Sequence, residues 1–142
     1  DWTLAKTISL GAVSMSVPET YEYTNRIDTK VEVSNGFDGN SVAIMMEDIA
    51  GRSQDSIFNQ KTANYPYPGD YIISDTTLLG RPTLRIETTI IVAYNLGGEH
   101  SINSFFFLED GKVYTIEYAW SKDYYTKSRN LMYEMLASLQ IR

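Results

Sequence analysis

Few side chains in this sequence of 142 residues could carry out chemistry. It has one histidine, His100, and no cysteine, which leaves no thiolate nucleophile, thiolate metal site or disulfide within these residues. The motifs Gly-x-Ser-x-Gly, Gly-x-x-x-x-Gly-Lys and Gly-x-Gly-x-x-Gly do not occur. As a general base, His100 would need a carboxylate partner, but its neighbour Glu99 points to the opposite face of a strand. We therefore interpret His100 as an exposed strand-end residue opposite Asn95, and any catalysis would have to rely on carboxylates alone.

Acidic residues gather around one predicted hairpin. Glu47 and Asp48 follow its second strand, and Asp38 lies in its loop. Asp38-Gly39-Asn40 resembles part of a calcium loop, but the twelve-residue spacing and the terminal glutamate are missing. We favour a solvated turn, and we expect neither a metal nor a cofactor.

The most unusual loop is formed by Tyr65, Pro66, Tyr67 and Pro68. A proline-stiffened aromatic loop loses little entropy on binding, so these four residues are a candidate partner-binding loop for a peptide, a glycan or a protein. The alternative, which we favour, is that the two tyrosines fold back and cover the edge of the core. Tyr124 and Tyr125, before the last predicted helix, are likewise interpreted as residues that staple the chain to the core.

Composition limits the class of partner. The net charge is −6 and the 12 basic residues are scattered singly, so no nucleic-acid partner is expected. No apolar stretch reaches the roughly 18 residues that span a bilayer. The length suits one domain over residues 1–142. The chain opens at Asp1 without methionine, which we interpret as a mature form whose leader was removed.

The first half of the sequence predicts strands and one helix. Gly11 predicts a bend in an extended segment, Ser53 is a candidate helix cap, and the polar stretch 19–28 shows no period. The predicted elements are an extended segment Ile8–Val17 ended by Pro18, strands Thr29–Ser34 and Val42–Met46 joined as a hairpin, and a helix Ser53–Asn64.

The second half predicts a meander and a final helix. Asp110-Gly111 is a strong two-residue hairpin signal, and it pairs Phe107 with Tyr114 and Phe105 with Ile116 on an aromatic face. The opposite face pairs Ser104 with Glu117 and is more polar. The predicted elements are strands Tyr71–Leu79, Thr83–Tyr94, His100–Leu108 and Lys112–Trp120, turns at Gly80-Arg81-Pro82 and Gly97-Gly98, and a helix from about residue 122 or 126 to 140. That helix carries an apolar stripe of Leu131, Met135 and Leu139, with Met132 and Leu136 beside it, which we expect to lie on the aromatic face.

Three segments carry a resemblance to known families: Ile8–Pro18, Asp110–Tyr118 and the end of the last helix, Leu136–Ile141. The order of elements is similar to the fold shared by the PsbP family of photosystem extrinsic proteins, the bacterial DcrB lipoproteins and the Ran-binding nuclear import factors. The resemblance implies an α+β fold, a central antiparallel sheet of about six to seven strands with two packed helices. It also implies binding or accessory roles, and export or lipid anchoring for many bacterial members.

These observations lead to three expectations about function. The first is a non-catalytic binding or accessory domain of an exported or lipid-anchored bacterial protein, whose partner is another protein or a small ligand and which meets a membrane only through a lost N-terminal anchor. The alternatives are a carboxylate-only hydrolase and a structural subunit of an envelope complex. Two acids meeting in a concave pocket would favour the hydrolase.

Overall fold

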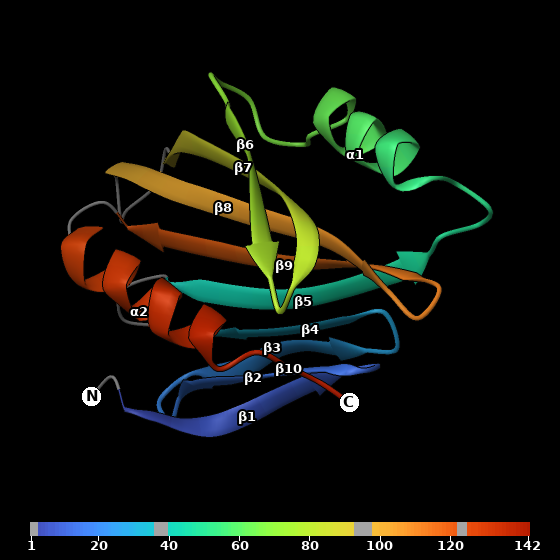
Figure 1. Ribbon diagram of the computed structural model, residues 1–142. Helices are drawn as coiled ribbons and strands as arrows, with labels where there is room; N and C mark the ends of the chain where they lie inside the picture. Colours follow the sequence, from blue (N-terminus) through green and yellow to red (C-terminus); the bar gives the residue numbers. More distant parts are fainter. Residues whose placement is uncertain (1–2, 36–39, 93–97, 122–124) are drawn as a thin grey trace.

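The computed structural model describes residues 3–35, 40–92, 98–121 and 125–142, apart from the side chains of residues 91, 92, 98, 125 and 126. Within these residues the chain folds into two sheets and two helices (Figure 1). The elements are β1 (Leu4–Leu10), β2 (Val13–Pro18), β3 (Glu22–Ile27), β4 (Lys30–Ser34), β5 (Ser41–Asp48), α1 (Gln54–Ala63), β6 (Ile72–Leu78), β7 (Arg81–Val92), β8 (Gly98–Glu109), β9 (Lys112–Ser121), α2 (Tyr125–Ala137) and β10 (Gln140–Ile141).

The larger sheet has seven strands in the order β3-β4-β5-β9-β8-β7-β6, and the smaller one has the order β1-β2-β10. Every strand pair is antiparallel. In Figure 1 the small sheet and α2 lie on one side of the molecule and α1 on the other. The predicted α+β fold with an antiparallel sheet and two helices is confirmed, and the small second sheet is an addition to it.

The hairpin of β8 and β9 has the register that the Asp110-Gly111 turn predicts. Phe107 lies opposite Tyr114, and Ser104 lies opposite Glu117. Both turn residues have positive φ, 48° for Asp110 and 75° for Gly111, which a tight turn between antiparallel strands requires. This register places the aromatic face of β9 toward the main core and leaves Glu117 on the outer face.

Two expectations about strand ends are corrected. Gly11, with φ 57°, reverses the chain, so the extended segment Ile8–Val17 is a β1–β2 hairpin. His100 is half-buried and not exposed, and it lies opposite Ile90 and not opposite Asn95. The ladder pairs Val92 with Gly98, so Gly98 belongs to β8 and is not part of the predicted Gly97-Gly98 turn; residues 93–97 lie outside the described residues.

Three element boundaries also differ from the prediction. The polar stretch 19–28 contains β3, an edge strand with mostly exposed residues and hence no apolar alternation. The turn after β6 is at Leu79 and Gly80, both with positive φ, and β7 begins at Arg81. The last helix ends at Ala137, and the chain continues into β10, which pairs with β2.

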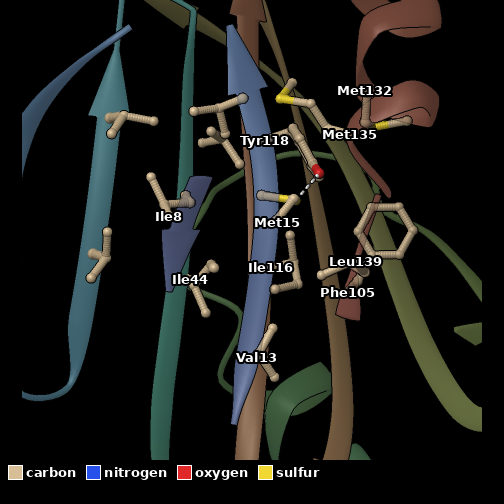
Figure 2. Packing of buried hydrophobic residues seen from close by; sticks show 14 of the residues in the cluster. Ile8, Val13, Met15, Ile44, Phe105, Ile116, Tyr118, Met132, Met135 and Leu139 are labelled. Atoms are coloured by element: carbon tan, nitrogen blue, oxygen red, sulfur yellow. Dashed lines mark hydrogen bonds between the residues drawn. The ribbon is translucent and has the colours of Figure 1, made fainter. Parts of the chain in front are cut away.

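The main core lies between the inner face of the large sheet, the small sheet and α2. Figure 2 shows Met15 of β2 beside Ile116 and Tyr118 of β9, with Met135 and Leu139 packed against them. The predicted stripe of the last helix is buried here through Leu131, Met132, Met135 and Leu139, and Leu136 packs against its edge.

Two tyrosines of β9 use their hydroxyl groups differently in this core. The Tyr118 hydroxyl donates to Met15 Sδ at 2.9 Å (Figure 2), and burial raises the pKa of Tyr118 well above its ordinary value. The Tyr114 hydroxyl instead accepts from the Ala12 backbone N–H at 2.9 Å and so binds the β1–β2 turn to the large sheet. A Cβ on Gly11 would collide with Tyr114 Oη and lie 3.0 Å from Met46 Sδ, so this approach requires glycine.

Candidate functional site: a cleft beneath the first helix

The helix α1 packs on the outer face of the large sheet because one short apolar side faces inward. Ser53 caps it, with the side-chain oxygen accepting from Ser56 N at 3.1 Å. Ile57 is fully buried, and Phe58 packs against a second, smaller cluster. That cluster consists of Tyr65, Leu84, Ile86 and Phe106. The predicted helix and its cap are confirmed, and the helix forms one wall of the site.

A cleft of about 410 Å³ opens between α1, the loop after it and strands β4, β5 and β9. Its volume lies in the range of small-ligand sites. Its lining combines aromatic, apolar, amide and charged side chains. The lining residues are Lys30, Met45, Glu47, Arg52, Gln60, Lys61, Asn64, Pro66, Tyr67, Phe106, Thr115 and Glu117.

Glu117 lies at the centre of a hydrogen-bond chain in this cleft. The Tyr67 hydroxyl donates to Glu117 Oε1 at 2.5 Å, and the Ser104 hydroxyl donates to Oε2 at 3.4 Å. Because the Ser104 hydrogen is used in this way, the Tyr65 hydroxyl donates to Ser104 Oγ, at 2.7 Å. Glu117 Oε2 therefore receives one long hydrogen bond and keeps acceptor capacity for another donor.

Burial shifts the pKa values of the side chains in this hydrogen-bond chain. Loss of solvent raises the pKa of the Glu117 carboxyl, while the hydrogen bonds from Tyr67 and Ser104 and the charge of Lys30 oppose the rise. Burial also raises the pKa of Tyr65 and Tyr67, so both phenols stay protonated and act as donors. The cleft thus holds a carboxyl group whose proton is bound more tightly than in water.

The opposite side of the cleft is an ion-pair cluster around Glu47. Lys61 Nζ lies 2.6 Å from Glu47 Oε1, and Arg52 Nη2 lies 3.9 Å from the same oxygen. Arg52 also donates to Ile49 O, Asp48 O and Gln60 Oε1 at 2.7 to 2.8 Å, which fixes the second half of α1 to the end of β5. The single negative charge of Glu47 is therefore shared by two cations, and the remaining Arg52 partners are neutral oxygens.

The four residues of the predicted binding loop differ in how deeply they are buried. Tyr65 is only 8% exposed, and its ring makes edge contacts with Tyr67 and Tyr71, as expected for tyrosines that fold back on the core. Tyr67 is half-buried and lines the cleft, while Pro66 and Pro68 are exposed. The role of the loop in partner binding stays a prediction.

Among the other sequence candidates, Glu47 lines the cleft. Glu47 and Asp48 pair with basic side chains, Lys61 and Lys112, and Asp38 lies outside the described residues. Of the two tyrosines before α2, Tyr124 lies outside the described residues, as does the side chain of Tyr125. Sequence reasoning placed Glu117 on the polar face but did not identify it as a site residue. The sequence did contain one signal for it: Glu117 is an acid in a strand rich in aromatic residues, and the hairpin register places it opposite a small hydroxyl side chain, Ser104.

No protein-family model matches the sequence, and no curated protein matches it. Solved structures do match in fold. The solution structure of cyanobacterial PsbP (CyanoP) from Synechocystis sp. PCC 6803 has a TM-score of 0.68 at 12% identity, over 92% of this chain and 87% of that one. The chain has the PsbP-like fold.

The other matches have the same fold at similar distance. The Saccharomyces cerevisiae Ran-binding protein Mog1p has a TM-score of 0.61 at 13% identity, over 96% of this chain and 94% of that one. LpqN of Mycobacterium tuberculosis, involved in cell envelope biogenesis, has a TM-score of 0.61 at 11% identity, over 91% of this chain and 82% of that one. A Bacteroides thetaiotaomicron structure has a TM-score of 0.68 at 14% identity, and the match covers 99% of this chain. This chain spans only 49% of that protein. The predicted likeness to PsbP and to the Ran-binding factors is confirmed for the fold.

Neither helix in the described part of the chain has the length and apolarity needed to cross a membrane.

Proposed function

We propose that this chain is a non-catalytic binding domain of an exported or lipid-anchored envelope protein, and that the cleft holds a neutral, hydroxyl-rich small molecule of the saccharide class. The observation that carries the proposal is the buried Glu117 carboxyl, hydrogen-bonded to Tyr67, in a cleft of ligand size. Specific ligand sites are largely apolar with a few oriented polar groups, and this cleft has that composition.

The charge balance supports an uncharged ligand. The cleft has three basic side chains, Lys30, Arg52 and Lys61, and two acidic ones. Glu47 pairs with two of the cations, Arg52 and Lys61, and the third, Lys30, lies 3.8 Å from Glu32. With Glu117 ionised, three carboxylates face three cations, and the group carries no net charge. A ligand with a full charge would have to displace one of these pairs, whereas hydroxyl groups can donate to and accept from the same side chains.

The aromatic lining of the cleft supports a ring-shaped ligand. Tyr67 is half-buried and offers part of its ring, whereas Phe106 is 5% exposed and lies under the Lys61 ammonium, 5.8 Å from the ring centroid. The amide side chains of Gln60 and Asn64 lie along α1 and at its end. Sugars present an apolar ring face together with directional hydroxyls, and the cleft offers a partner for each.

A carboxylate-only hydrolase is the second candidate, because two acids line one cleft and the Glu117 pKa is raised. Such an enzyme needs a proton-bearing acid and a second, available carboxylate. Glu117 suits the first role. Glu47 is paired with Lys61 and Arg52. It lies on β5, the strand beside that of Glu117, and is about four residues from Glu117 along the β5–β9 ladder, roughly 13 Å by backbone rise. This separation and pairing favour binding over hydrolysis.

The envelope location is proposed on the likeness to LpqN, a protein involved in cell envelope biogenesis, together with the shared PsbP-like fold. Sequencing the complete gene and fractionating the native protein test it. A leader peptide and recovery in the envelope fraction are expected. Recovery with cytosolic markers would refute the location without affecting the cleft.

The ligand class is tested by titrating ¹⁵N-labelled protein with glucose and N-acetylglucosamine, and with acetate and lysine as charged comparisons. We expect the sugars to shift the side-chain amide signals of Gln60 and Asn64, and Glu117→Gln to weaken that response. Glu134→Gln, an exposed change on α2, is the matched control and leaves it unchanged. A response to the charged probes alone would refute the saccharide class, and turnover of nitrophenyl glycosides that Glu117→Gln abolishes would favour the hydrolase.

A further inference from the structure

The two edges of the large sheet are protected to different degrees. At the β3 edge the pairing shifts register between Tyr23 and Asn25, and Glu22 and Arg26 add charges. Bulges and charges of this kind prevent an edge from pairing with another strand. At the β6 edge the pairing with β7 runs without a shift from Ile72 to Leu78. The only charged residue of β6 is Asp75, and the strand has no lysine, arginine or proline.

The β6 edge also exposes apolar side chains. Ile72 is 64% exposed and Ile73 48%, and Tyr71 and Leu79 beside the strand are exposed as well. Among the residues that the structure describes, β6 pairs with β7 alone, so every second residue of β6 directs its N–H and C=O groups away from the sheet. This edge is therefore a free template for one further strand.

A groove runs along this edge, on the far side of α1 from the cleft. It has a volume of about 650 Å³. Phe58 of α1 and Leu84 of β7 are apolar parts of its wall, and Ile73 of β6 reaches into it. A helix and an exposed strand edge that border one groove form the geometry in which peptides bind by strand addition.

The groove carries two unbalanced negative charges. Asp55 of α1 and Asp75 of β6 both line it. Within the part of the chain described, neither carboxylate has a hydrogen bond or an ion pair; the ion pairs of this region belong to Glu47, Asp48 and Glu109 instead. An occupant with a positive charge at this point would complement both acids.

We infer that the β6 edge and the groove beside it bind an extended segment of a partner protein, which adds to the sheet as an antiparallel strand. Its groove-facing side chains are a basic residue opposite Asp75 and, two positions later, an apolar residue opposite Ile73. The spacing follows from the period of two along a strand.

A second copy of this chain fits the same edge poorly. In any symmetric antiparallel pairing of two β6 strands centred on Ser74, Asp75 or Thr76, the two Asp75 residues lie opposite or within two positions of each other. The two acidic grooves would then meet, and each chain carries a net charge of −6. A basic partner segment removes this repulsion.

The test uses blocked peptides with the sequence Ser-Thr-Arg-Thr-Val-Thr-Ser and the ¹⁵N-labelled protein. We expect shifts of the β6 amides and their protection from hydrogen exchange. Replacing arginine by glutamate in the peptide, or Asp75→Lys in the protein, should weaken binding at least about fivefold, since loss of an attraction of about 1 kcal/mol alone corresponds to that factor and the repulsion adds to it. The pair of Asp75→Lys with the glutamate peptide should regain affinity.

Two controls separate strand addition from general attraction. Asp28→Lys makes the same change in net charge at the opposite edge, in the β3–β4 turn, and should leave binding unchanged. A peptide with N-methyl groups on the amides that face β6 keeps its side chains but cannot donate to the edge, and it should not bind. Equal binding of the methylated peptide, equal weakening by Asp28→Lys, or a dimer of the protein formed through β6 would overturn the inference. Because the substituted side chains are exposed, the fold is expected to persist, as the remaining amide signals will show.

Discussion

Tyr114 and Tyr118 allow one chemical change, loss of a hydroxyl, to be made twice at equal burial with opposite expected results. Each side chain is 1% exposed. Tyr114→Phe leaves the Ala12 N–H without its partner, and because Ala12 is half-buried, water replaces that bond only in part. We expect a loss of about 1–2 kcal/mol in the free energy of unfolding, or about 3–6 °C in Tm for a chain of this length.

Tyr118→Phe removes a hydroxyl whose partner is the Met15 thioether, a weak acceptor. Burying a hydroxyl without a good partner costs about 1–3 kcal/mol, so its removal should be neutral or should stabilise the protein by up to about 1 kcal/mol. Urea unfolding of both variants with unchanged m-values is the assay. A loss in Tyr118→Phe as large as that in Tyr114→Phe would refute the reasoning, because the sulfur contact would then equal a hydrogen bond to the backbone.

Three further predictions concern Glu117, Gly11 and Ser53. The folded pKa of Glu117 is raised, so its contribution to stability is complete below the ordinary glutamate pKa and is lost as pH rises through the folded value. Glu117→Gln should therefore gain stability relative to wild type as pH rises from about 4, the ordinary glutamate range, through the folded pKa of Glu117, and urea midpoints that stay parallel would contradict this. Gly11→Ala should lower the free energy of unfolding by more than about 1 kcal/mol, because of its positive φ and the collision with Tyr114 Oη. The loss should be smaller in a Tyr114→Phe background. If the two losses simply add in the double-mutant cycle, the collision is relieved in another way. Ser53→Ala should cost about 1 kcal/mol by removing the cap of α1, with exchange of the α1 amides increasing before that of β9; unchanged exchange in α1 would count against the cap.

The sequence predicted best where local rules determine the structure. The Asp110-Gly111 turn fixed the β8–β9 register, and Ser53 fixed the start of α1. Prediction from the sequence failed where a strand lies exposed at a sheet edge or pairs with a segment far away in the chain. β3 is exposed and so lacks a period, and β10 is two residues long and pairs with a strand more than a hundred residues away.

The cleft was predictable only in part, for the same reason. The position of Glu117 opposite Ser104 follows from the hairpin, and the folding back of Tyr65 follows from the chemistry of tyrosine. That Tyr67 reaches Glu117, 50 residues away, depends on how α1 lies across the sheet. Propensity and turn chemistry do not contain that information.

The small sheet has a consequence for the order of events during synthesis. Its central strand, β2, is made more than a hundred residues before one of its neighbours, β10. Ser138 Oγ further accepts from Ser16 N at 2.9 Å, and Arg142 N donates to Ala12 O at 2.8 Å. A nascent chain on the ribosome therefore exposes one edge of β2 until residues 138–142 emerge, and closing so long a loop is slow. Removal of these last five residues should leave a chain that binds chaperones during translation while its large sheet is already formed.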